Sequence, residues 1–183
     1  QSETTLVGLA LGISTQARIA SSINDESGAL AISARAVETI RPLATGPSPS
    51  APLRRTFGEV MNMHGFLQAR NRQEAAVASL EEARSAYRAI DELRMNDLAS
   101  AAGFAESSSW LVQAYRQFGR NEEAKRAGRE ALDVAAKVLE KRPGHMQALR
   151  AQALTTSPLS ALLSSEMRLA EALVTVDTAQ RAW

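Results

Sequence analysis

Residues 111–135 read LVQAYRQFGRNEEAKRAGREALDVA, and no other part of the chain indicates the class of fold so clearly. Apolar residues recur there at three- and four-residue steps on both sides of Gly119. That spacing is typical of one face of an α-helix, and glycine tolerates the left-handed backbone of a sharp turn. The stretch therefore predicts two antiparallel helices joined by a short turn.

Two earlier stretches align with this one without gaps, which indicates an internal repeat. The shared positions are Ala29-x₃-Ser33-x₂-Ala36-x₃-Ile40, Ala76-x₃-Leu80-x₂-Ala83-x₃-Tyr87 and Ala124-x₃-Gly128-x₂-Ala131-x₃-Ala135. The first alanines are 47 and then 48 residues apart, and each lies five residues after Asn24, Asn71 or Gly119. The four-three-four spacing keeps one helix face turned inward. Small residues on that face allow two helices to approach closely, which explains an alanine-rich core with few aromatics in a chain where 34 of 183 residues are alanine.

Punctuation by Gly, Pro, Asn and Asp predicts about eight helices and no strands, an all-α fold. They cover about residues 3–22, 24–41, 53–69, 73–94, 97–118, 121–142, 146–155 and 158–183. Four prolines between Pro42 and Pro52 predict a linker. The dipeptide Ser157-Pro158 has the sequence of a helix start and predicts where the last helix begins. Because the breaks are short, the helices are expected to pack on one another as antiparallel neighbours.

The repeat resembles the tetratricopeptide repeat, in which small and large residues recur at fixed points of a helix pair. The third copy matches best, with Leu111-Val112-x₂-Tyr115 before Gly119 and with Pro143 at its end. The period departs from the 34 residues usual in the family, since the second helix of each pair is longer. In this respect the chain is similar to long-period repeat regions attached to bacterial signalling proteins. The resemblance covers roughly residues 10–154 and implies a right-handed superhelical stack of antiparallel helix pairs.

On this basis we expect a single helical-repeat domain over residues 1–183. Repeat 1 covers about 3–43, the proline-rich linker 42–52, repeat 2 about 53–95 and repeat 3 about 97–142. A partial repeat and a capping helix would cover 144–183. The chain starts without Met and ends abruptly on Trp183, so we interpret it as a fragment of a larger bacterial signalling or regulatory protein.

The composition excludes several kinds of chemistry. The chain has no cysteine and two histidines, His64 and His145, so neither a thiolate nor a metal site is expected. It contains no phosphate loop, no G-x-G-x-x-G and no G-x-S-x-G, so we predict no enzymatic activity and no cofactor. Both histidines are interpreted as structural, His64 as packed or partly solvated and His145 as exposed in a turn.

Charge and hydropathy narrow the expected partners. A net charge of +1 argues against a nucleic-acid surface. The longest apolar run, Leu6 to Ile13, has eight residues and includes two glycines, whereas a membrane span needs roughly 20, so no membrane contact is expected. The compartment stays open, with the cytoplasm favoured.

The resemblance implies a function in protein binding, with a peptide or helix held in a concave groove. The family's groove positions map to Ser109, Gln113 and Arg116, to Met61, Gly65 and Gln68, and to Ser14, Arg18 and Ser21. The second and third copies lack the family's lysine/asparagine clamp for a carboxylate, so a chaperone tail is not expected.

Two alternatives remain open. The first is self-association, possible as a homodimer, through the C-terminal helix. Its apolar residues, too many for one stripe, are Leu159, Leu162, Leu163, Met167, Leu169, Ala170, Leu173, Val174 and Val176. The second alternative is a sensory domain that binds a small molecule between helices.

Overall fold

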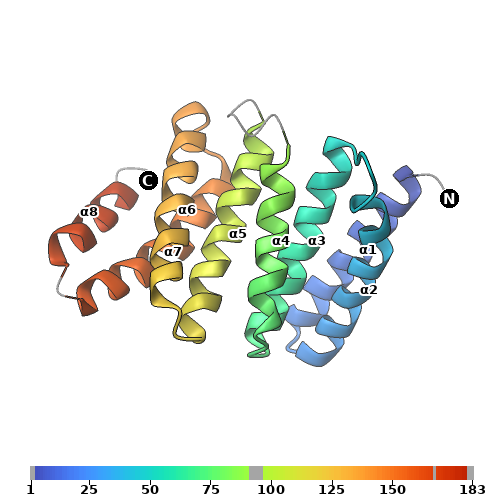
Figure 1. Ribbon diagram of the computed structural model, residues 1–183, viewed down its shortest axis with the longest axis horizontal. Coiled ribbons are helices and arrows are strands. Elements are labelled where there is room, and N and C mark those ends of the chain that lie inside the picture. The colour runs from blue at the N-terminus through green and yellow to red at the C-terminus, as the bar shows by residue number, and fades with distance from the viewer. Residues whose placement is uncertain (1–2, 91–96, 167, 181–183) are drawn as a thin grey trace. The chain divides into compact units, whose positions relative to one another are not determined.

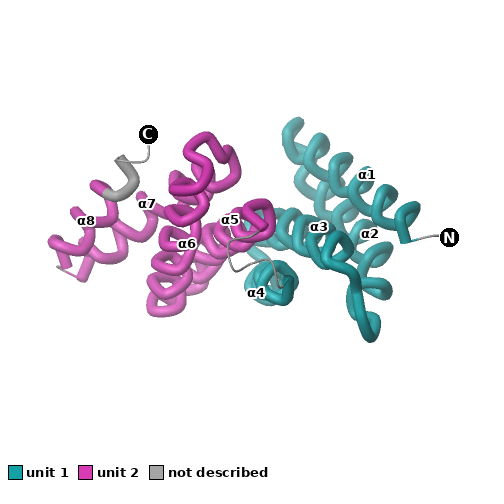
Figure 2. The backbone as a smooth tube through the Cα atoms, turned by 90° about the horizontal axis from the view of Figure 1, so that it is seen from above, with its two compact units in different colours: residues 1–90 teal, residues 91–183 magenta. Residues whose placement is uncertain are grey.

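The computed structural model describes residues 3–90, 97–166 and 168–180, and over these residues it is all-helical, with eight helices and no strand. Its contacts divide the chain into two compact units, residues 1–90 and 91–183, where the sequence predicts one domain (Figure 2). The boundary lies close to the predicted border between the second and third repeats. Each unit is described by itself.

Unit 1 contains four helices, α1 (Glu3–Ser22), α2 (Glu26–Ala44), α3 (Ala51–Arg70) and α4 (Ala75–Arg88). Consecutive helices run antiparallel, and α1 packs on both α2 and α3 (Figure 1). The core between α1, α2 and α3 is built on Ile13, Ile40, Leu53, Phe57 and Met61. The predicted all-α class and the antiparallel pairs are confirmed within this unit.

Unit 2 contains α5 (Leu98–Gln117), α6 (Asn121–Lys141), α7 (Met146–Ser165) and α8 (Leu169–Gln180). Helix α5 packs on α6 and on α7, and α8 packs on α7 (Figure 1). The core between α5, α6 and α7 consists mostly of alanines from all three helices. Asp97 begins α5 as an N-cap, because its carboxylate accepts hydrogen bonds from the backbone N–H groups of Ala99 and Ser100.

The inward helix face predicted from the alanine spacing is confirmed by burial. All twelve aligned positions, from Ala29 to Ala135, are buried. Glycines permit close approaches between α3 and α4: a Cβ atom at Gly58 would lie 2.8 Å from the Tyr87 ring, and one at Gly65 would lie 2.7 Å from Leu80 Cγ. These two glycines therefore lie where α3 and α4 touch, although the family resemblance maps Gly65 to a groove.

The three repeat turns share one hydrogen-bond pattern. Two residues beyond the end of the first helix of each pair, one residue has a positive φ. The next N–H donates to the carbonyl five residues earlier, which is a Schellman turn. The positive-φ residues are Asn24, Arg72 and Gly119. The sequence predicts the first and third, but in the second copy the left-handed residue follows Asn71, whose side-chain amide instead donates to the Leu67 carbonyl at 2.8 Å.

The predictions based on proline need correction. Helix α2 continues through Pro42 to Ala44, because Leu43 and Ala44 pack against the core of unit 1. Pro52 lies in the first turn of α3, where its missing N–H costs nothing. The non-helical linker is therefore only residues 45–50. Helix α4 ends at Arg88, and its predicted end at Arg94 lies outside the described residues.

The predicted helix start at Ser157-Pro158 is wrong. Helix α7 runs through Pro158 to Ser165, and the last helix, α8, begins at Leu169. Proline removes the hydrogen bond to the carbonyl four residues earlier, which belongs to Leu154. Gln113 Nε2 of α5 lies 3.4 Å from this carbonyl oxygen and donates to it. The burial of Leu159, Leu162 and Leu163 beyond the proline holds the continued helix in place.

Candidate functional site

Most residues that the sequence places in a groove lie inside the fold. Met61 is 1% exposed within the core of unit 1, and Gln68 and Gly65 are buried on the same helix. Ser109 is fully buried and its hydroxyl donates to the Ala151 carbonyl at 3.0 Å. As they stand, these side chains are not accessible to a peptide.

The predicted groove residues of the first repeat copy lie partly at the surface and partly inside the fold. Ser14 and Ser21 are buried, because the steps Ala10–Ser14–Ala17–Ser21 follow the inward face of α1. Arg18, which lies off that face, is exposed. The sequence offset from a family motif assigns residues to positions but does not specify how each helix is rotated about its own axis. That rotation decides which side chains are accessible.

The predicted groove residues of the third repeat copy include two that a partner could reach. Arg116 is exposed near the end of α5, and Gln113 is half-buried with its amide donated to α7. Arg18, Met61 and Gln68 belong to unit 1, whereas Ser109, Gln113 and Arg116 belong to unit 2. Within either unit the structure does not gather the predicted residues into one open groove.

A serine–histidine contact in unit 1 has the residue types of a nucleophile and a base but lies inside the fold. Ser33 Oγ lies 2.8 Å from His64 Nδ1 and 2.8 Å from the Leu30 carbonyl oxygen. The hydroxyl has one proton, and whether it donates to the ring or accepts from it depends on the histidine tautomer. Ser33 is also only 1% exposed. Burial, and next the charge of Arg41, lowers the pKa of His64, which keeps the ring neutral.

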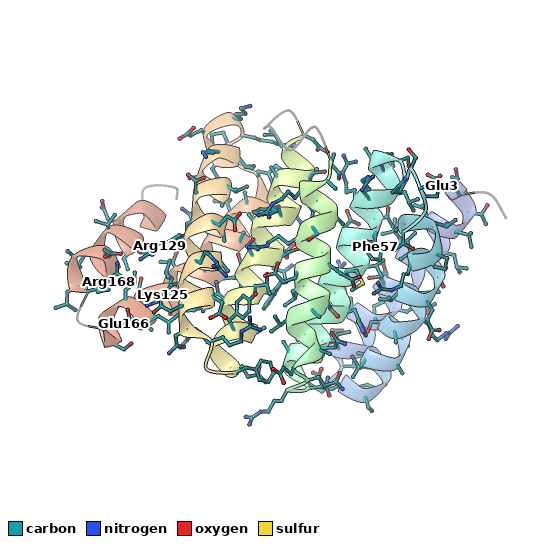
Figure 3. The ribbon with its side chains drawn as sticks, in the orientation of Figure 1. Glu3, Phe57, Lys125, Arg129, Glu166 and Arg168 are labelled. Carbon is teal, nitrogen blue, oxygen red and sulfur yellow. The ribbon has the colours of Figure 1, made fainter. Side chains whose placement is uncertain are left out.

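A buried lysine in unit 2 also has a structural role. Lys125 is 3% exposed, and its Nζ lies 2.5 Å from Glu122 Oε1 and 2.6 Å from Glu166 Oε1. Hydrogen bonds to Glu122, and next to Glu166, raise the pKa of Lys125. The amine therefore stays protonated and is not a nucleophile. Figure 3 shows Lys125 and Glu166 where α6 meets the end of α7.

Metal and membrane features are missing from the part of the chain that the structure describes. No group of three or more acidic or histidine side chains there is placed to hold a metal ion. None of the described helices combines the length and hydropathy that crossing a membrane requires.

A cavity of about 330 Å³ lies between α6, α7 and α8. Its lining residues are Arg129, Leu163, Ala170, Glu171, Val174 and Thr175. Arg129 Nη2 donates to Glu171 Oε2 at 2.9 Å and forms one rim of it, next to Arg168, as Figure 3 shows. Its volume is at the lower end of the range of small-ligand pockets, and its lining is mostly apolar.

Exposed large apolar side chains concentrate on the first and last helices. Eight such residues are found in the described chain, and they are Leu9, Ile19, Ile23, Met146, Leu169, Leu173, Val174 and Val176. Seven of these eight belong to α1, to the residue that follows it, or to α8. Exposed apolar residues that gather on one face mark interaction sites, whereas scattered ones need no explanation.

Sequence reasoning identified one of these two faces and missed the other. It named nine apolar residues of the expected last helix as too many for one stripe. Of these, Leu169, Leu173 and Val176 are exposed on α8 and Val174 is exposed beside the cavity, whereas Leu159, Leu162 and Leu163 are buried in α7; Met167 lies outside the described residues. The α1 face was missed, although the run Leu6–Ile13 contains its signal in Gly8 and Gly12.

Comparisons with family models, with curated proteins and with solved structures found no match to this chain.

Proposed function

We propose that this protein is a non-catalytic interaction module of stacked helix pairs, which binds the apolar face of a helix from a protein partner. The observation that carries the proposal is the concentration of exposed apolar side chains on α1 and α8. The side chains of Ser33 and His64, and those of Lys125 and Glu166, contact each other inside the fold. The chemistry left for function is therefore apolar docking.

The physical mechanism would be docking onto a preformed surface. Leu169, Leu173 and Val176 lie at steps of four and three residues along α8 and form one stripe. A helical partner can lay its own stripe along this one. Because α8 is already folded, association loses little conformational entropy on this side.

The tetratricopeptide-like relationship, with its right-handed superhelix, belongs to the same proposal. The three Schellman turns and the twelve buried repeat positions support it. Peptide capture near Arg18 or Arg116 is the family-based version of the function. Both arginines are exposed, and alanine in place of Arg116 should weaken such binding without changing helicity.

A library of amphipathic helical peptides, panned against the purified full chain, tests the proposal. We expect enriched peptides with apolar residues at three- and four-residue steps. Their binding should be lost in Leu173→Glu, because a charge would then lie in the stripe. Met146→Glu is the matched control, since Met146 is 76% exposed but lies outside both faces. Peptides that bind Leu173→Glu as well as the native chain would contradict the proposal.

A further inference from the structure

The solvent face of α1 carries two glycines followed by large apolar side chains. Gly8 and Gly12 are exposed, and a Cβ atom added at either would meet nothing within 4 Å. Ile19 and Ile23 continue the same face and are 58% and 71% exposed. Glycine is a poor helix former, so its presence twice on one face has no benefit for α1 alone. It allows the side chains of another helix to approach the α1 backbone.

The solvent face of α8 has the opposite character. Its stripe consists of branched side chains, with Leu169 59%, Leu173 71% and Val176 37% exposed. Leu169 and Leu173 are separated by four residues, and so are Gly8 and Gly12. At 1.5 Å per residue both pairs span about 6 Å. Two projecting side chains of α8 therefore match two hollows of α1 in spacing.

We propose that a second copy of this chain covers each face, with α8 of one copy packed on α1 of another. This inference rests on the proposed function and names its partner. Pairing α8 with α8 would oppose leucine to leucine and would leave the two glycines without a role. Pairing α1 with α1 would oppose hollow to hollow and leave α8 uncovered. Packing α8 on α1 uses both faces, and it is a head-to-tail contact.

Charge selects the orientation of the two helices. When Leu169 lies on Gly8 and Leu173 on Gly12, the helices are parallel and Asp177 falls beside residue 16, within two residues of Arg18. Asp177 and Arg18 are both exposed. Asp177 comes directly after the apolar residue Val176 on α8, whereas Arg18 comes directly before the apolar residue Ile19 on α1. In a parallel pair of helices, residues at these two positions lie on the same side of the contact. The antiparallel register brings Asp177 to Thr4 instead, far from Arg18, so the geometry favours the parallel one.

The experiment measures the mass of the full chain by sedimentation over a range from about 1 μM to about 1 mM. We expect the native mass to rise with concentration. Leu173→Glu removes a projection, and Gly12→Leu fills a hollow where there is open space and leucine favours the helix. Each variant alone should associate at least about tenfold more weakly than the native chain. Met146→Glu should associate like the native chain.

Mixing the two variants gives the decisive result. Leu173→Glu retains an intact α1 and Gly12→Leu an intact α8, so an equimolar mixture should form a dimer and nothing larger. Arg18→Asp should weaken association of the native chain, and the double variant with Asp177→Arg should restore it. Circular dichroism should show the native helicity in each variant, as a check that the variants fold.

Several outcomes would overturn the inference. A Gly12→Leu variant that dimerises alone as tightly as the native chain would indicate α8-to-α8 pairing, and a Leu173→Glu variant that does so would indicate α1-to-α1 pairing. A native chain that stays monomeric at the highest concentration excludes a second copy as the partner. If that monomer still captures helical peptides through Leu173, the proposed function holds and only its partner has been named wrongly.

Discussion

The closest approach between α3 and α4 leads to a prediction about Gly65. Alanine at this position would place a Cβ atom 2.7 Å from Leu80 Cγ, 3.0 Å from Leu80 Cδ2 and 3.2 Å from the Leu80 backbone nitrogen. Leu80 is fully buried, so its side chain has no solvent to turn into. Relief therefore requires α4 to move away from α3.

Two effects of opposite sign determine the size of the change. Replacing glycine by alanine inside a helix stabilises it by about 1 kcal/mol. Extra volume in a packed core costs about 1–3 kcal/mol. Because one of the close contacts is backbone, we expect the upper part of that range and a net destabilisation of about 1–2 kcal/mol. The matched control is Gly12→Ala, where the added methyl group meets nothing and should stabilise by about 0.5–1 kcal/mol.

Urea unfolding followed by circular dichroism, at a concentration where the chain is monomeric, measures both variants. The midpoint of Gly65→Ala should fall while that of Gly12→Ala rises. In thermal unfolding, a loss of 1 kcal/mol corresponds to about 2–4 °C for a chain of this size. If Gly65→Ala is as stable as Gly12→Ala, the helices are not in the contact described, and the argument from close packing is refuted.

Three further predictions concern polar contacts. The pKa of His64 is lowered from its ordinary value of 6.5, so the unfolded chain binds the proton more readily than the folded chain. The free energy of unfolding should therefore fall as the pH drops below 6.5. In urea titrations at several pH values, His64→Gln should make this dependence on pH weaker. Gln113→Ala should cost up to about 1 kcal/mol, because a carbonyl of α7 loses its donor, but nothing when Pro158→Ala restores the backbone N–H, as a double-mutant cycle would show. Lys125→Gln should speed amide hydrogen exchange in α8 without affecting unit 1. The control is Lys137→Gln, which should leave exchange in α8 unchanged because the Lys137 side chain is 52% exposed. Equal exchange in both variants would contradict the role of the buried lysine.

The helical register could be predicted because it depends on local chemistry. Asn24 and Gly119 adopt the left-handed backbone that the sequence predicts for them, since few residue types tolerate it. The alanine spacing predicts the buried face of α2, α4 and α6, because a helix fixes which positions share a side. In the second turn the prediction misses by one residue, at Arg72. There the Asn71 side chain bonds to the Leu67 carbonyl, a choice that residue type alone does not indicate.

The prolines show where local rules fail. Pro42 and Pro158 each predict a helix boundary, and both lie inside helices. In both cases the energy lost at the proline is offset by partners distant in sequence: the core of unit 1 for Leu43, and Gln113 with the buried leucines for α7. Such contacts exist only after folding, so no window of sequence around the proline contains them.

The candidate site likewise has properties that follow from local sequence and properties that depend on packing. Composition and periodicity alone establish an all-α chain with a repeated helix pair, no cysteine chemistry and an apolar last helix, because these properties follow from residue type and spacing. Which side of each helix remains accessible depends on rotation and on neighbouring helices, and folding settles it. Folding buries Met61, Gln68 and Ser109 and leaves Gly8 and Gly12 open to solvent. A surface consists of the faces left uncovered after packing, so it is a property of the folded chain and not of any segment of its sequence.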